Sequence, residues 1–169
     1  TNVRKQWLAK YDRNSTLDYN SQYVTVHEFI NYDLIHFSNS DNIRSIPNMM
    51  DGLKPSQRKV LFATLKRNLT DKEIRVAQLA GYTSENAAYH HGEASLQGTI
   101  INMAQNFVGS NNIELLEGVG QFGTRILGGK DAGQPRYIYT KLSKITPKIF
   151  NQLDSPLLED QYDDGLKVE

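Results

Sequence analysis

The chain has 169 residues, no net charge at pH 7 and 38% hydrophobic side chains, which suits one main domain of ordinary size. It contains no cysteine, so disulfides and thiolate metal ligands are excluded. No unbroken apolar stretch approaches the ~20 residues that a membrane helix needs, and no basic-then-apolar leader opens the chain, so a soluble protein without a membrane partner is expected.

The charges are unevenly distributed along the chain. Residues 54–76 and 121–150 are strongly basic, whereas residues 151–169 are acidic. Two basic segments on one face would attract a polyanion, and nucleic acid is the commonest one. Charge alone leaves two solvated helix faces as an equal alternative.

The first half of the chain is predicted to be helical. Apolar residues recur at helical spacing from Val26 to Phe37, and Thr25 with Glu28 is typical of a capping box. The segment 48–55 contains a glycine and a proline that break this pattern, and Pro55 suits the first turn of a basic, amphipathic helix to about Asn68.

Two shorter helical patterns follow, from Ile74 to about Gly81 and from Glu93 to about Phe107. A pair of helices with a compact connection is typical of a helix-turn-helix. Many helical proteins contain such pairs, so this pattern alone is a weak indication of DNA binding.

Residues 118–133 contain six of the twelve glycines and match G-x-G-x-x-G between Gly118 and Gly123. A dinucleotide site is rejected, because that fingerprint needs a strand before it and a helix after it. A flexible hairpin that leads into a strand at 136–140 is expected instead. A helix-turn-helix followed by such a hairpin is the order of a winged helix, so the fold expected is mainly α with a small β wing (α+β), a winged-helix domain containing a helix-turn-helix.

Arg136 and Tyr137 follow the glycine-rich segment and could meet a phosphodiester. A tyrosine phenol ionises only near pH 10 and is a poor nucleophile without help. A neighbouring guanidinium favours the phenolate and stabilises charge on phosphoryl oxygens. From these residues alone, Tyr137 and Tyr139 as ordinary strand aromatics remain the stronger interpretation.

The histidines of Tyr89-His-His-Gly-Glu93 precede a helix, where they could donate to a phosphate or relay a proton. A metal site is disfavoured, because the spacing is not that of a zinc motif and no other dense ligand cluster is present.

Most of residues 24–150 resembles the eukaryotic-type type IIA DNA topoisomerases, with the family's motifs in the family's order. The resemblance is carried by Phe37-Ser-Asn-Ser-Asp-Asn42, Ser45-Ile-Pro-Asn48, Asp51-Gly-Leu-Lys-Pro55, Gln57-Arg-Lys-Val-Leu-Phe62, Val76-Ala-Gln-Leu-Ala-Gly81, Tyr89-His-His-Gly-Glu93, Asn106-Phe-Val-Gly-Ser-Asn111, Gly120-Gln-Phe-Gly-Thr-Arg125, Gly128-Gly-Lys-Asp131 and Pro135-Arg-Tyr-Ile-Tyr-Thr140.

The resemblance implies that Tyr137, directly after the arginine of Pro-Arg-Tyr, cleaves DNA by transesterification and holds the 5′ end as a phosphotyrosine. Arg136, His91 and Arg58 match positions that contact or activate the scissile phosphate. The expected DNA-binding positions are Lys54, Lys59, Ser95, Gln97 and Arg125.

The resemblance also divides the chain into a connector from the preceding Toprim domain (1–22), a winged-helix cleavage domain (23–150) and the start of the tower domain (151–169). It implies Mg²⁺ bound by the Toprim domain and ATP bound by another domain, both outside this chain. The full enzyme is expected to be a homodimer that passes one DNA duplex through another, in the nucleus or, if viral, the host cytoplasm. A non-catalytic winged-helix module and a structural dimer scaffold are the rival hypotheses.

Overall fold

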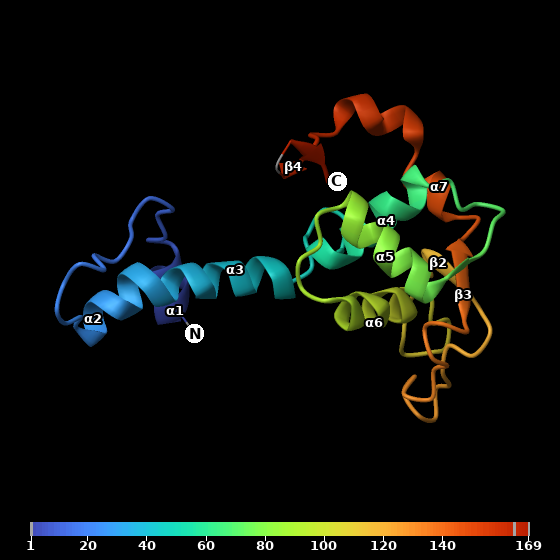
Figure 1. The fold of residues 1–169 in the computed structure, drawn as a ribbon, viewed down its shortest axis with the longest axis horizontal. Coiled ribbons are helices and arrows are strands. Elements are labelled where there is room, and N and C mark those ends of the chain that lie inside the picture. Colours follow the sequence, from blue (N-terminus) through green and yellow to red (C-terminus); the bar gives the residue numbers. More distant parts are fainter. Residues whose placement is uncertain (1, 164, 169) are drawn as a thin grey trace. The chain divides into compact units, whose positions relative to one another are not determined.

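The computed structural model describes residues 2–163 and 165–168 and divides the chain into two compact units, residues 1–55 and residues 56–169 (Figure 1). Each unit is described by itself.

The first unit is built around one helical run. Helix α2 (Val26–Phe29) continues through a π-helical segment, η1 (Ile30–Leu34), into α3 (Ile35–Ser45), and α1 (Asn2–Leu8) packs against α3. The predicted helix ended near Phe37, eight residues too early. A π-helical turn holds an extra residue, so the face that follows no longer continues the apolar spacing that was read from the sequence.

The start of this run matches the sequence prediction. The Thr25 hydroxyl accepts the Glu28 N–H at 3.2 Å, and the Glu28 carboxylate accepts the Thr25 N–H at 2.9 Å, which completes the capping box. The indole N–H of Trp7 donates to the side-chain oxygen of Asn31 at 3.2 Å and ties α1 to the run.

The second unit begins with α4 (Pro55–Lys66), whose buried residues are Val60, Leu61, Ala63 and Thr64. A two-residue strand, β1 (Ile74–Arg75), precedes α5 (Val76–Asn86), and α6 (Glu93–Met103) packs against α5. The helix predicted from Ile74 therefore begins two residues later. Ile74 and Arg75 are strand because their backbone pairs with a strand far along the chain, which local periodicity does not report.

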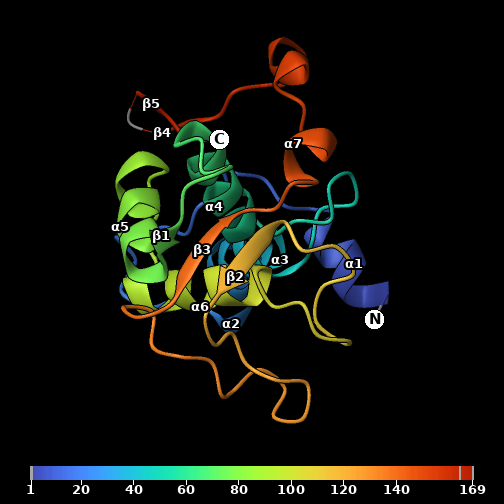
Figure 2. The same cartoon turned by 90° about the vertical axis from the view of Figure 1, so that its right-hand side faces the viewer.

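Three antiparallel strands complete this unit, in the order β1-β3-β2. Strand β2 (Leu116–Val119) pairs with β3 (Tyr139–Leu142), so that Val119 faces Tyr139 at the open end of the hairpin, and β1 pairs with the other edge of β3. Figure 2 shows the three strands side by side, with the β2–β3 connection extending past their ends. The expected α+β winged helix is confirmed in these elements.

The core of the second unit lies between its helices and the inner face of the sheet. Alternate β3 side chains point inward, with Thr140 and Leu142 buried, as the two-residue period of a strand requires. The largest fully buried apolar side chains come from all of these elements: Val60, Val76, Leu79, Leu96, Ile100, Leu116 and Leu142.

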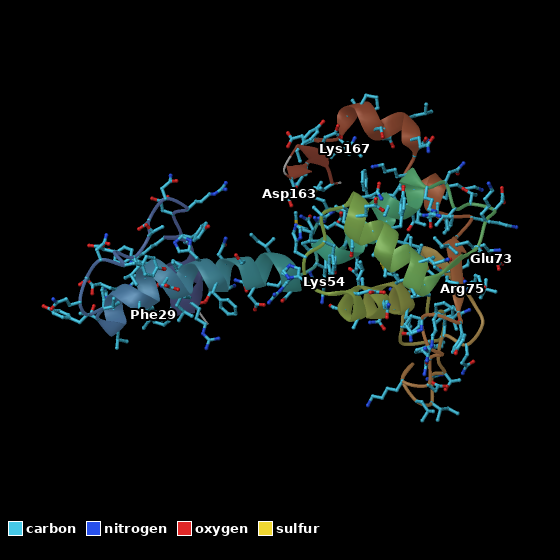
Figure 3. The ribbon with its side chains drawn as sticks, viewed as in Figure 1. Phe29, Lys54, Glu73, Arg75, Asp163 and Lys167 are labelled. Carbon is cyan, nitrogen blue, oxygen red and sulfur yellow. The ribbon has the colours of Figure 1, made fainter. Side chains whose placement is uncertain are left out.

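After the sheet come α7 (Thr146–Ile149), a 3-10 segment η2 (Gln152–Leu157) and a small hairpin of β4 (Tyr162–Asp163) and β5 (Leu166–Lys167), with Asp163 and Lys167 marked in Figure 3. Lys167 forms an ion pair with Asp160. The predicted domain boundaries at 22/23 and 150/151 stay predictions.

Candidate functional site

The turn that carries Arg136 and Tyr137 is anchored to the first turn of α5. The N–H groups of a first helical turn have no partner within their own helix, and the N-cap residue Arg75 supplies no side-chain cap. Backbone carbonyls of the turn take this role: Ile138 accepts the Val76 N–H and Pro135 accepts the Ala77 N–H, both at 3.0 Å. The turn and the helix-turn-helix are therefore joined by their backbones.

Two further contacts hold the turn in place. Its own closure is a hydrogen bond from the Tyr137 N–H to the Gln134 carbonyl at 2.9 Å. Directly after Tyr137, the Ile138 side chain is buried, so it pins the chain as it enters β3. The predicted strand at 136–140 was thus too long: Arg136 and Tyr137 lie in a turn, and the strand begins at Tyr139.

The turn presents a phenol and a guanidinium together. The Tyr137 side chain is 69% exposed, and the Arg136 Cζ lies 5.1 Å from the centre of its ring. The Gln134 side-chain oxygen accepts from Arg136 Nε at 2.8 Å and from Nη2 at 2.6 Å. This pair orients the guanidinium, whose other N–H groups can meet the oxygens of an anion.

Behind the turn, the remainder of the β2–β3 connection is closed by a carboxylate. Asp131 accepts the Thr124 N–H at 2.8 Å on one oxygen and the Gln121 side-chain amide at 3.2 Å on the other. The Thr124 backbone hydrogen bond is the main reason that the pKa of Asp131 lies below its usual value. The Gly129 N–H adds a bond to the Thr124 carbonyl at 2.9 Å.

This closure needs glycine where the two limbs of the connection touch. A Cβ on Gly123, whose φ is +94°, would lie 2.5 Å from the Gly129 Cα. On the inner side, the buried Gln105 amide donates to the Phe122 carbonyl at 2.9 Å. The glycine-rich segment is therefore a specific closed loop.

The α5–α6 connection and the start of α6 present polar groups. The His91 and Tyr89 rings meet edge to face at 5.6 Å, and the Tyr89 hydroxyl donates to Ser95 Oγ at 3.3 Å. On the first turns of α6, the Gln97 amide donates to the Glu93 carboxylate at 2.7 Å. His91 and Ser95 are exposed and Gln97 is half-buried.

The basic residues expected to bind DNA have different surroundings. The half-buried Lys59 on α4 donates to the carbonyls of Ala87 at 2.6 Å and Ala88 at 3.2 Å, and so caps the end of α5. Its neighbour Arg58 is half-buried on α4, and Arg125 is exposed in the β2–β3 connection. Lys54 lies in the first unit.

The structure brings some predicted site residues together and leaves others apart. Arg136 and Tyr137 share one turn, and His91 lies one ring from the Tyr89–Ser95 pair. Across residues 2–163 and 165–168, no hydrogen bond, ion pair or ring contact links these two groups. No set of three or more His, Asp or Glu side chains that could hold a metal ion occurs among the residues described, and none of their helices is long and apolar enough to cross a membrane.

Sequence reasoning missed three residues that shape the site: Gln105, Asp131 and Gln134. A buried glutamine at the end of an apolar helix is an available signal for Gln105, because a buried amide needs a partner. The carbonyl that it meets is 17 residues away in sequence, which no local pattern indicates. Gln134 is close enough to Arg136 for a side-chain contact to be foreseen.

The element order α4-β1-α5-α6-β2-β3, with a helix-turn-helix and a paired β-hairpin, defines a winged-helix protein of the kind that binds nucleic acid. The DNA gyrase/topoisomerase IV family, defined on the A-type chain of those enzymes, matches residues 44–169, and the C-terminal associated domain of TOPRIM matches residues 1–42. The chain belongs to this family, the type IIA DNA topoisomerases, and corresponds to its breakage-reunion region. The resemblance carried by the ordered motifs is confirmed.

Individual relatives agree with this assignment. DNA topoisomerase 2 of Saccharomyces cerevisiae is 56% identical over 166 residues and DNA topoisomerase 2-alpha of Cricetulus griseus is 54% identical over 178 residues; each match covers 98% of this chain and 12% of the relative. The crystal structure of the Plasmodium falciparum topoisomerase II DNA-binding, cleavage and re-ligation domain superposes with a TM-score of 0.84 at 54% identity, covering 99% of this chain and 23% of that one. The chain thus spans about an eighth of the length of its curated relatives.

Proposed function

We propose that this chain is the DNA-cleaving segment of a type IIA topoisomerase and that Tyr137 is its nucleophile. The carrying observation is an exposed phenol beside a guanidinium, on a turn bonded to the first helix of a helix-turn-helix. A strand aromatic with only a packing role would have no need of such exposure. The family assignment of the chain supports the same residue.

The reaction is an exchange of phosphate esters. The Tyr137 oxygen bonds to phosphorus, the bond from phosphorus to the 3′ oxygen breaks, and the 3′ end leaves as a hydroxyl after taking up a proton. The 5′ end stays on the enzyme as a phosphotyrosine. Because one ester replaces another, attack by the 3′ hydroxyl reseals the strand without a new energy source.

Arg136, His91 and Arg58 form the proposed phosphate pocket. The fork of Arg136 is oriented by Gln134, and its other N–H groups suit two phosphoryl oxygens at once. An exposed imidazole at His91 can donate to a phosphate oxygen or carry the proton of the phenol. Cationic donors at these positions would stabilise the charge that grows on phosphorus-bound oxygens during attack.

Five further residues are proposed to bind the DNA around the break: Lys54, Lys59, Ser95, Gln97 and Arg125. Ser95 and Gln97 lie on the first turns of the second helix of the helix-turn-helix, the element that enters the major groove in this class of domain. Arg125, in the wing, suits the sugar–phosphate backbone. The support for Lys59 is weaker, because its ammonium already caps α5.

The full-length protein is proposed to be a homodimer that cleaves both strands of one DNA duplex and passes another through the gap, using ATP. We propose that Mg²⁺ binds the Toprim domain and ATP a further domain, since the described residues of this chain form no metal cluster. One relative is named as mitochondrial, DNA topoisomerase 2 of Dictyostelium discoideum; for this protein the nucleus, or the host cytoplasm if viral, is proposed.

The test uses the full-length enzyme with Mg²⁺ and duplex DNA, trapped with denaturant. DNA labelled at its 3′ end should migrate with the protein, whereas DNA labelled at its 5′ end should not, because the adduct holds the 5′ end of the break. Tyr137→Phe should abolish the adduct, and the control Tyr139→Phe, on the same hairpin, should keep it. An adduct that survives in Tyr137→Phe would overturn the assignment, and DNA binding without any adduct in wild type would favour a non-catalytic winged helix.

A further inference from the structure

The β2–β3 connection ends in an apolar tip that no part of the proposed reaction uses. Ile126 is 94% exposed and Leu127 is 55% exposed. Arg125 precedes them and Lys130 follows, and both are exposed. An isolated exposed aliphatic side chain is ordinary on a protein surface, but two adjacent ones between cations, on a loop of fixed shape, call for an explanation.

The shape of the tip is set before any ligand arrives. Consecutive turns are closed by the Gly128 N–H to the Arg125 carbonyl at 3.2 Å and by the Lys130 N–H to the Leu127 carbonyl at 3.1 Å. Asp131 and Thr124 fasten the base of the tip. A loop ordered in advance loses little conformational entropy when it binds, so the tip is suited to insertion.

We propose that Ile126 is an apolar wedge that enters the minor groove of duplex DNA and opens a base step, while Arg125 and Lys130 contact the phosphates on either side. This inference rests on the proposed DNA-cleaving function. Apolar side chains that enter the minor groove partly unstack a base step and bend the duplex. Because Tyr137 lies on the same connection, the wedge would act on the duplex that Tyr137 cleaves.

The charges of the connection favour DNA over a protein surface as the partner. Between residues 120 and 138 the cations are Arg125, Lys130 and Arg136, and the single acid is Asp131. Both carboxylate oxygens of Asp131 accept hydrogen bonds within the connection itself. The centres of protein interfaces are depleted in charged residues, whereas a tip rimmed by cations complements two rows of phosphates.

The experiment uses the full-length enzyme and duplexes that carry 2-aminopurine at successive steps around the cleavage position. The fluorescence of 2-aminopurine rises when it unstacks. Wild type should raise the signal at one step on each side of the break, and Ile126→Ala should lose that rise and bind about tenfold more weakly, as expected for a lost aliphatic contact. Ile126→Leu should retain it.

Two controls separate the wedge from general binding. Val108→Ala truncates another exposed aliphatic residue of the same unit (73% exposed) and should leave the signal and affinity unchanged. Arg125→Gln should lower the slope of log affinity against log salt by about one while keeping the fluorescence rise, because it removes a phosphate contact and not the wedge.

The outcomes distinguish the wedge from the function on which it rests. If wild type forms the tyrosyl adduct but Ile126→Ala keeps the full fluorescence rise, the wedge is wrong and the proposed function stands. If Ile126→Ala instead alters dimer dissociation in sedimentation and leaves the DNA signal intact, the tip docks on protein, which also overturns the wedge. If wild type shows neither salt-dependent DNA binding nor an adduct, the proposed function itself fails.

Discussion

Two alanine substitutions in the β2–β3 connection test whether its closed shape depends on the contact between Gly123 and Gly129. Gly123 and Gly128 both have positive φ, +94° and +58°, so alanine at either position costs about 1–2 kcal/mol of backbone strain. Only at Gly123 would the new Cβ also strike backbone, 2.5 Å from the Gly129 Cα; at Gly128 nothing lies within 4 Å. Overpacking of this kind costs roughly a further 1–3 kcal/mol.

The difference between the two variants isolates the close approach, because the strain is shared. A further 1–3 kcal/mol corresponds to opening that is about ten to a hundred times more frequent. Hydrogen exchange of the peptide 120–133 in the full-length enzyme measures it, and the Thr124 and Gly129 amides are the reporters because both are bonded within the connection. Equal exchange in Gly123→Ala and Gly128→Ala would refute the reasoning.

Three further predictions concern side-chain contacts. Gln105→Leu should leave the buried Phe122 carbonyl without its donor and destabilise the wing by about 1–3 kcal/mol, seen as faster exchange in 120–133 but not in α5. Because the pKa of Asp131 is lowered in the folded wing, its stabilisation is complete above the usual value of 3.8 and is lost as pH falls through the lowered pKa; exchange at Thr124, corrected for chemistry, should rise only in that acidic window and be pH-independent in Asp131→Asn. Lys59→Met should increase exchange at the end of α5, where Ala87 loses its donor; a fall of about one in the salt slope of DNA binding would show that Lys59 also contacts phosphate.

Local patterns predicted the helices better than the strands. The capping box at Thr25 and the proline at the start of α4 are signals carried by neighbouring residues, and both mark where helices begin in the structure. Strand β1 was missed because Ile74 and Arg75 are strand only through pairing with Thr140 and Tyr139. The Arg75 guanidinium, 5.4 Å from the centre of the Tyr139 ring (Figure 3), adds a contact that spans the same distance in sequence.

For the candidate site, chemistry alone left Tyr137 as a plausible strand aromatic, and the ordered family motifs raised it to the leading nucleophile. Its exposure and its place in a turn depend on the bonds from Val76 and Ala77, about 60 residues earlier in the chain. The closed wing likewise depends on Gln105 meeting a distant carbonyl. Contacts of this kind arise only when the chain is folded, so residue types and spacing could not indicate them.

The backbone bonds from Val76 and Ala77 to the Pro135–Ile138 turn also have a mechanical consequence. They make the reading head and the blade a single tool: a tilt or slide of α5 on a duplex carries Tyr137 with it by the same amount. Under the proposed function, the phosphate that is cut is chosen when the helix-turn-helix seats, and no later movement of the turn corrects it. Substitutions that shift the start of α5 should therefore move the cleavage position along the DNA and not merely slow the reaction.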